Sequence, residues 1–202
     1  MITINGTYGN NGNLKLGKGA SLTNRQAGTT CPGASEWCAL NCYAKHGRYQ
    51  QFGLQTKYGA CTLELPARPR SVFRWNVSGD FDTVDAVNYA IEYMAAHPET
   101  KFWAYTRSWN VPALLPALER MRQLPNMQLF GSTDPSMPKP PDSWRVAYLE
   151  IDDRFKGMEC LEQAHTIACE SPCKAKTHVG KMPDCKTCGY CFKKEKGSVQ
   201  FN

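Results

Sequence analysis

The sequence predicts an α/β protein built as an incomplete, TIM-like β/α barrel that is followed by a cysteine-rich metal-binding module. Three observations predict this. From residue 72 onwards, strand patterns alternate with helical patterns of about a dozen residues, which is typical of parallel β/α units. A closed eightfold barrel takes about 250 residues, whereas the chain has 202. From residue 159 onwards, cysteine, lysine and glycine replace the periodicity, so we expect the barrel over residues 1–158 and the module over 159–202.

The N-terminal third is expected to be mostly irregular. The first thirty residues are rich in Gly and Asn, and only residues 14–16 suggest a strand. Residues 37–52 predict one helix. Pro66 and Pro69 interrupt the stretch that follows.

The regular part begins with a predicted strand over residues 72–78, and further strands are predicted over 101–106, 127–131 and 145–151. Between the first two, Asp82 is expected to cap a helix whose apolar residues step by three and four. After the second strand, Asn110 and Pro112 are expected to open another helix. The apolar faces of the two helices consist of Val84, Val87, Ile91 and Met94, and of Leu114, Leu118 and Met121.

The composition favours a globular protein without a membrane span. Apolar residues make up 42% of the chain and aromatic residues 11%, both within the globular range. No apolar run approaches the roughly 20 residues of a membrane helix, and residues 1–6 lack the features of a secretory signal. We therefore expect a cytoplasmic protein. Its formal charge of +6 indicates a solvated basic face, with a nucleic-acid surface as the alternative.

Ten cysteines are the main chemical feature of the chain. In a reducing cytoplasm, clustered cysteines are more often metal ligands or catalytic residues than disulfide partners. Cys61 and Cys160 stand apart, and the other eight form two groups. The first group is Cys31, Cys38 and Cys42, and the second is Cys169, Cys173, Cys185, Cys188 and Cys191. This grouping predicts two metal centres.

The second group predicts a [4Fe–4S] cluster. Cys185, Cys188 and Cys191 have the C-x₂-C-x₂-C spacing of bacterial ferredoxins, in which a further cysteine comes from elsewhere. Cys173 is the expected fourth ligand, and Cys169 is its alternative. The same thiolates would also satisfy tetrahedral zinc, although zinc motifs normally consist of separated C-x-x-C pairs. We therefore prefer iron–sulfur and keep structural zinc as the alternative.

The first group, which we call the cysteine trio (Cys31, Cys38 and Cys42), predicts another [4Fe–4S] cluster with one open iron. It supplies three thiolates, and the nearest further cysteine is Cys61, which would close the site if it were a ligand. An open iron can bind a small molecule through an amino and a carboxylate group. Three buried free thiols are the alternative interpretation.

Several motifs resemble the phage and plasmid gene-product-eighty-eight family. They are Cys31-Pro-Gly-Ala-Ser, Cys38-x₃-Cys42-Tyr43-Ala44, Ser78-Gly79-Asp80-Phe81, residues 102–109 and the final Cys-x₂-Cys-x₂-Cys-aromatic run. The resemblance covers about residues 28–192. It implies a phage or mobile-element origin, and hence the host cytoplasm, but no activity.

A wider resemblance is to radical-SAM enzymes, which bind a three-cysteine cluster in a loop near the first strand. These enzymes hold the amino group of S-adenosylmethionine (SAM) at the end of the second strand and its ribose at a later one. The resemblance therefore implies SAM contacts from two segments, Ser78-Gly79-Asp80 for the amino group and Ser132 with Asp134 for the ribose. Ligands bind at the C-terminal ends of barrel strands in this architecture. The C-x₆-C-x₃-C spacing of the trio differs from the C-x₃-C-x₂-C of radical-SAM enzymes.

Two functions remain open at this point. The first is an enzyme of radical-SAM-like type, or one that uses the open iron as a Lewis acid, with Arg107 clamping an anionic group of the ligand. The second is a non-enzymatic module, held together by a cluster or zinc, that binds nucleic acid or a host protein. A small molecule at the open iron would favour the first function, whereas salt-sensitive binding of DNA or RNA would favour the second.

Overall fold

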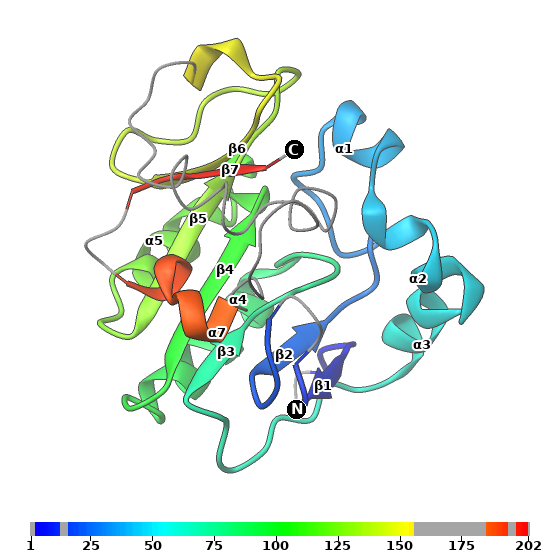
Figure 1. Cartoon of the computed structure of the whole chain (residues 1–202), viewed down its shortest axis with the longest axis vertical. Helices are drawn as coiled ribbons and strands as arrows, with labels where there is room; N and C mark the ends of the chain where they lie inside the picture. The colour runs from blue at the N-terminus through cyan, green and yellow to red at the C-terminus, as the bar shows by residue number, and fades with distance from the viewer. Residues whose placement is uncertain (1–2, 13–15, 156–184, 194–196, 202) are drawn as a thin grey trace, which may run out of the picture.

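A seven-stranded sheet forms the centre of the computed structural model, which describes residues 3–12, 16–155, 185–193 and 197–201. The strands lie side by side in the order in which they occur along the chain (Figure 1). The first two run antiparallel, and every later neighbour is parallel. The strands are β1 (Thr7–Gly9), β2 (Ser21–Asn24), β3 (Val72–Arg74), β4 (Lys101–Thr106), β5 (Met127–Ser132), β6 (Arg145–Leu149) and β7 (Val199–Phe201). The prediction of a mixed α/β protein with a mostly parallel sheet is confirmed.

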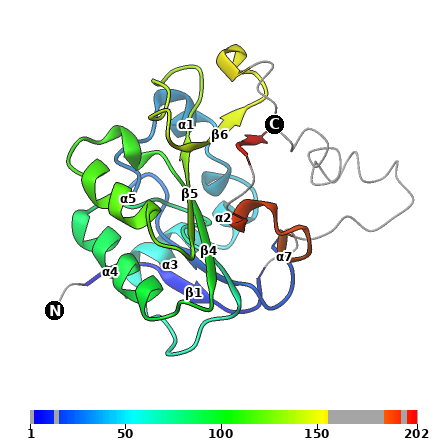
Figure 2. The same ribbon diagram turned by 90° about the vertical axis from the view of Figure 1, so that its left-hand side faces the viewer.

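Two helices, α4 (Val84–Ala95) and α5 (Leu115–Arg122), cover one face of the sheet. Figure 2 shows both on the same side of β4 and β5. Their apolar residues share one buried cluster with alternate residues of the strands, because successive strand side chains point to opposite faces. This cluster includes Val87, Met94, Leu118 and Met121 from the helices and Phe73, Phe102 and Leu129 from the strands.

The opposite face of the sheet is covered by residues 185–193, which we call the tail segment. It contains α7 (Cys185–Cys188) and η5 (Tyr190–Phe192). The ring of Phe192 lies 5.3 Å from that of Trp103, and the buried Tyr190 packs with Phe130. Because β7 then pairs with β6, the C-terminal residues belong to the same sheet as the rest. The division of the chain at residue 158 stays a prediction.

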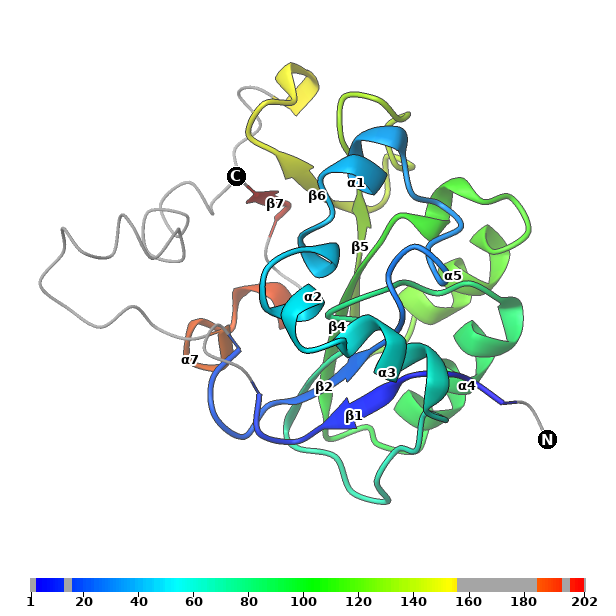
Figure 3. The same ribbon diagram turned by 90° about the vertical axis from the view of Figure 1, so that its right-hand side faces the viewer.

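The connection from β2 to β3 contains α1 (Glu36–Leu40), η1 (Tyr43–Lys45), α2 (Arg48–Gln51) and α3 (Leu54–Ala60). Figure 3 shows α1 at the level where β5 ends, and α3 lower down, near β1. The prediction of one helix over residues 37–52 is wrong. Cys42 has an extended backbone and Gly47 has a φ of 56°, so the helical path is interrupted twice.

The predicted strand over residues 101–106 is confirmed, whereas the end of β3 and the cap of α4 differ from their predictions. β3 ends at Arg74 because Asn76 has a φ of 49°, which does not fit an extended strand. Thr83, not Asp82, caps α4: its Oγ1 accepts a hydrogen bond from the N–H of Ala86 at 3.1 Å. Asp82 instead forms an ion pair with the buried Arg25 at 2.7 Å.

The start of α5 also differs from its prediction. Asn110 belongs to η2 (Ser108–Asn110), and a turn that contains Pro112 separates η2 from the helix. Pro116 occupies the first turn of α5, where its missing N–H costs no helical hydrogen bond. In the part of the chain that the structure describes, no helix is long and apolar enough to cross a membrane.

Candidate functional site

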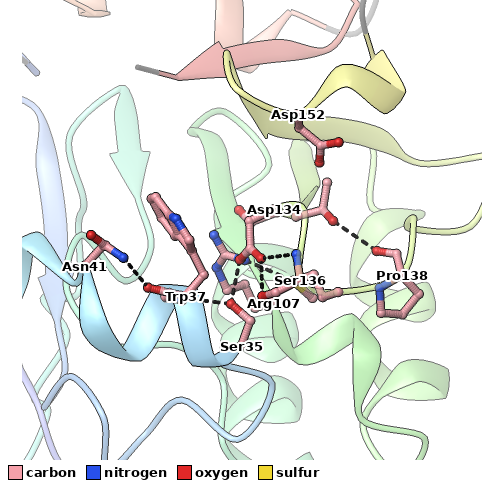
Figure 4. Close-up of polar contacts among 12 residues, drawn as sticks. Ser35, Trp37, Asn41, Arg107, Asp134, Ser136, Pro138 and Asp152 are labelled. Carbon is pink, nitrogen blue, oxygen red and sulfur yellow. Dashed lines mark hydrogen bonds and ion pairs between the residues drawn. The ribbon is translucent and has the colours of Figure 1, made fainter.

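The carboxyl ends of β3, β4 and β5 hold most of the predicted site residues. Ser78, Gly79 and Asp80 follow β3, and Arg107 follows β4. Ser132 and Asp134 lie at the end of β5 and just beyond it. Carboxyl ends of parallel strands meet along one edge of a sheet, where ligands commonly bind. Helix α1 is attached to the same edge, because the hydroxyl of Ser35 donates to Asp134 Oδ2 at 2.5 Å (Figure 4).

Asp134 is fully buried and receives hydrogen bonds on both carboxylate oxygens. The N–H and hydroxyl of Ser136 donate to Oδ1 at 2.9 and 2.6 Å, and Ser35 and Arg107 bind Oδ2 (Figure 4). Burial by itself would raise the pKa of Asp134. The hydrogen bonds from Ser136 and Ser35 and the charge of Arg107 outweigh it and lower that pKa. Asp134 is therefore a carboxylate that holds α1 and Arg107 in place.

Asp80 is also buried, and its carboxylate holds the loop after β4. Oδ1 accepts from the Thr106 hydroxyl at 2.6 Å and from the N–H of Phe81 at 2.8 Å. Oδ2 accepts from the N–H groups of Arg107 and Ser108 at 2.7 and 3.3 Å. Burial raises the pKa of Asp80, although these hydrogen bonds act to lower it. An ammonium group at Asp80 would have to compete with four protein donors.

Ser78 and Gly79 contact the chain itself. The Ser78 hydroxyl donates to the carbonyl of Arg25 at 3.0 Å. Gly79 has a φ of 75°, and a Cβ at this position would lie 2.5 Å from Thr30 Oγ1. Glycine is needed here because residues 25–30 pack against it. At Ser132, the carbonyl accepts a hydrogen bond from Trp109 Nε1 at 2.8 Å.

The cysteine trio lies beside these carboxylates, and all three thiols are free and half-buried. Burial raises the pKa of Cys31 to about 12, and the charges of Asp80, Cys38 and Cys42 act in the same direction. The N–H of Gly28 hydrogen-bonds the Cys31 sulfur and acts in the opposite direction. Charges influence each other's ionisation in this way only when they are close.

Cys38 connects the trio to the ion pair at the end of the strands. Burial raises the pKa of the Cys38 thiol. The charge of Arg107 acts to lower this pKa, and those of Cys42 and Asp134 act to raise it. The structure therefore brings the trio together with Asp80, Arg107 and Asp134 at one edge of the sheet.

The spacing of these side chains does not match a site for a single metal ion. Among the described residues, no group of three His, Cys, Asp or Glu side chains is arranged to hold one ion. Zinc requires every thiolate sulfur at about 2.3 Å from one centre. A cubane spreads its ligands, since each thiolate binds a different iron. The metal centre at the trio stays a prediction.

The second cysteine group is described in part. Cys160, Cys169 and Cys173 lie outside the described residues. In the tail segment, the hydroxyl of Tyr105 donates to Cys191 Sγ at 2.8 Å, and Cys185 packs against the buried cluster that contains Trp103. Cys188 ends α7. The metal centre at these residues stays a prediction.

Cys61 directly follows α3, in a part of the structure away from the trio. The carbonyl of Cys61 accepts from the N–H of Gly6 at 2.9 Å, and Thr62 pairs with Asn5. Figures 1 and 3 both show α3 close to β1 and away from α1, the helix that contains Cys38. Cys61 therefore lies apart from the cysteine trio.

Sequence reasoning missed Met137 and Arg154, which complete the surroundings of Asp134. Met137 Sδ accepts from Arg107 Nη1 at 2.9 Å. Arg154 donates to the carbonyl of Asp134 at 2.5 Å and pairs with the buried Asp152 at 2.6 Å. The contact of Ser136 with Asp134 has a sequence signal, because an Asp commonly accepts from the residue two positions on. No local signal indicates Arg154.

The fold and the site together define an α/β protein with a polar, cysteine-containing site at the carboxyl edge of a parallel sheet. The family model described as Gene product 88 matches residues 60–194, more than half of the chain. The protein therefore belongs to the Gene product 88 family, and the motif-based assignment is confirmed. Searches of curated proteins and of solved structures found no match. The matched residues include Asp80, Arg107 and Asp134, whereas the trio precedes them.

Proposed function

We propose that this protein is an iron–sulfur protein whose cysteine trio holds a [4Fe–4S] cluster with one open iron. The observation that carries the proposal is the convergence of three free, half-buried thiols that influence one another's ionisation. Three thiolates suit three corners of a cubane, and a backbone N–H already faces one of these sulfurs. The positive charge of Arg107 beside Cys38 would offset part of the negative charge of the thiolates.

The finer proposal is a partial β/α barrel of radical-SAM-like type. Parallel strands in sequential order support it, because this is the strand order of β/α barrels, in which ligands bind at the carboxyl ends. When bound, the open iron would supply a Lewis acid, or an electron for the cleavage of SAM. Arg107 would orient an anionic group of the ligand, and Asp80 would keep the Arg107 loop in place. Since Gly79 is covered by residues 25–30, the proposed contact of an amino group is limited to Asp80.

Purification without oxygen, followed by measurement of iron, sulfide and zinc, tests the proposal. We expect about eight irons per chain if both cysteine groups hold cubanes, and about four fewer in Cys38→Ala. Cys61→Ala is the matched control, because Cys61 is also free and half-buried, and it should keep all iron. Zinc as the only metal, or equal iron in Cys38→Ala and the parent, would contradict the cluster. Loss of iron in Cys61→Ala would contradict the open site.

Electron paramagnetic resonance of the reduced protein tests for a ligand at the open iron. A ligand that binds the open iron changes the spectrum of the cluster, and SAM is the first compound to add. A spectrum that SAM leaves unchanged would remove SAM from the proposal and keep the cluster. The same measurement on Asp80→Asn, in protein that retains its iron, asks whether Asp80 contributes to SAM binding.

A second candidate function is the binding of single-stranded nucleic acid. Leu40, Tyr43 and Phe52 are 59–71% exposed on the β2–β3 connection, and the basic Lys45 and Lys57 are exposed on the same connection. Aromatic side chains next to basic ones are typical of single-strand binding. This candidate predicts binding of a single-stranded oligonucleotide that weakens steeply as salt increases. Phe52→Ala should weaken that binding, whereas it should leave the iron content unchanged.

A further inference from the structure

One arginine on the face of the sheet that the tail segment covers, Arg74, pairs with no carboxylate among the described residues. Arg74 ends β3, is half-buried, and has an Nε shielded from solvent. Its guanidinium makes no hydrogen bond or ion pair with any residue in the described part of the chain. Partial burial of an unpaired charge is unfavourable. The fold therefore maintains Arg74 in a position that a bound anion would stabilise.

Other arginines close to the carboxyl edge of the sheet differ from Arg74 in this respect. Arg25 pairs with Asp82, Arg107 with Asp134, and Arg154 with Asp152. Each of these guanidinium groups is engaged by a carboxylate of the protein itself. Among these four arginines, Arg74 is the one whose charge the described residues leave uncompensated.

Tyr105 contacts the guanidinium of Arg74, and two further tyrosines near the end of β3, Tyr43 and Tyr49, pack against each other with ring centroids 5.9 Å apart. The Cζ of Arg74 lies 5.0 Å from the centre of the Tyr105 ring, so the planar group is stacked and its orientation is restricted. The positive charge of Arg74 acts to lower the pKa of Tyr49, although burial raises it. The Tyr43 hydroxyl is bound to the carbonyl of Val77. The Tyr49 hydroxyl has no hydrogen-bond partner among the described residues, so it can donate to a ligand.

We propose that Arg74 and the hydroxyl of Tyr49 bind the oxyanion of a small molecule, a phosphate or carboxylate group, on this face of the sheet. A stacked guanidinium presents two parallel N–H donors that match such an oxyanion. The phenol adds a third donor. Tyr43, Tyr49 and Tyr105 carry no carboxylate, so none of them would repel an anion there.

The anion site lies next to the cysteine trio. Tyr43 directly follows Cys42 of the trio, and its ring packs against that of Tyr49 at 5.9 Å. On its other side, Tyr105 contacts Cys191 of the tail segment. A molecule bound through its oxyanion at Arg74 could therefore extend towards the trio. The anion site goes beyond the proposed cluster and does not require it.

Isothermal titration of the full-length protein with inorganic phosphate, and separately with acetate, tests the site and distinguishes the two sources of the oxyanion. We expect the parent and Arg68→Gln to bind one of the two probes. Arg68 is exposed on the loop before β3, and its replacement changes the net charge equally. Arg74→Gln should bind about tenfold to a hundredfold more weakly, as expected for the loss of a charged donor pair. Arg74→Lys keeps the charge but lacks the two parallel N–H donors, so its affinity for the probe should be intermediate.

Two further variants serve as controls, one for a folding defect and one for binding of the probe to the iron of the trio. Tyr49→Phe should weaken binding severalfold and should keep the circular dichroism of the parent. Cys38→Ala, with its trio cluster lost, should bind the probe as the parent does. Equal affinity in Arg74→Gln and the parent, or no binding of either probe to the parent, would overturn the site. Loss of binding in Cys38→Ala would show that the probe binds iron, which also overturns it.

Discussion

At the level of single residues, the loops at the carboxyl edge of the sheet are held by three buried aspartates. Asp80, Asp134 and Asp152 follow β3, β5 and β6, and each accepts hydrogen bonds from the protein. Hydrogen bonds stabilise the anionic form of a buried carboxylate, which burial alone disfavours, and the carboxylate in turn fixes the groups that donate to it. These aspartates position the loops. The cysteine trio and Arg74, which pairs with no carboxylate in the described part of the chain, are left as groups that can bind something else.

Asp152 should make the stability of the protein depend on pH. The hydrogen bond from Arg154 lowers the pKa of Asp152. Below the ordinary aspartate pKa of about 3.9, the unfolded chain takes up a proton that the folded chain does not. The contribution of Asp152 to the free energy of unfolding is therefore present above about pH 4 and decreases as the pH falls towards the lowered pKa.

The prediction is that Asp152→Asn is less stable than the parent at pH 7 and loses less stability between pH 4.5 and pH 3. Urea unfolding at a series of pH values measures this. Asp142→Asn is the control, because Asp142 is exposed, and it should follow the parent. An Asp152→Asn curve parallel to that of the parent would show that Asp152 does not contribute to the acid sensitivity.

At the level of elements, the loop before α1 determines where the cysteine trio lies. Gly33 is buried against the loop after β4: a Cβ at this position would overlap the carbonyl of Arg107 and would lie 2.8 Å from the N of Ser108. The backbone of the trio's loop can approach β4 this closely because residue 33 has no side chain. This backbone contact and the hydrogen bond from Ser35 to Asp134 together hold the loop of the trio beside Arg107.

Gly33→Ala should therefore destabilise the protein by about 1–3 kcal/mol, the usual cost of overpacking, and should lower the iron content of the trio. Urea unfolding and iron analysis measure the two effects. Gly9→Ala is the matched control, because a Cβ there would make an ordinary contact of 3.4 Å with the side chain of Leu22. If Gly33→Ala is as stable as Gly9→Ala and binds as much iron, the close contact does not position the trio.

At the level of the whole molecule, the two faces of the sheet are covered in different ways. Helices α4 and α5 cover one face through their own periodic apolar residues, and the tail segment covers the other through Tyr190 and Phe192 (Figure 2). The tail segment is short and has little apolar periodicity. A metal centre at its cysteines would supply folding free energy that apolar burial does not.

Cys188→Ser should therefore lower the melting temperature by several degrees. In a protein of this size, about 1 kcal/mol corresponds to roughly 2–4 °C. Calorimetry together with metal analysis measures the effect, and Cys61→Ser provides the control for the removal of a thiol. If Cys188→Ser loses all metal from the tail and melts at the temperature of the parent, the centre has no structural role.

The sequence by itself determined the fold class, the elements with strong periodicity and the family. β4 follows its predicted range, and α4 and α5 are present. A long periodic apolar pattern indicates that one face of a helix or strand is buried, and it does so without identifying the element that packs on that face. Site residues at strand ends were also predictable, since parallel strands bring their carboxyl ends to one edge. The short strands β1 and β7 have three residues each, which is too few for a periodic pattern.

The tertiary structure decided the pairing of polar groups that are far apart in the chain. Asp82 has the pattern of a helix cap, yet it binds Arg25, 57 residues away. Ser35 binds Asp134 across 99 residues, and the same contact brings the trio beside Arg107. Local sequence patterns report which groups are buried or capped. They do not report which partner satisfies a buried charge, because that choice depends on groups that only the folded chain brings within hydrogen-bond distance.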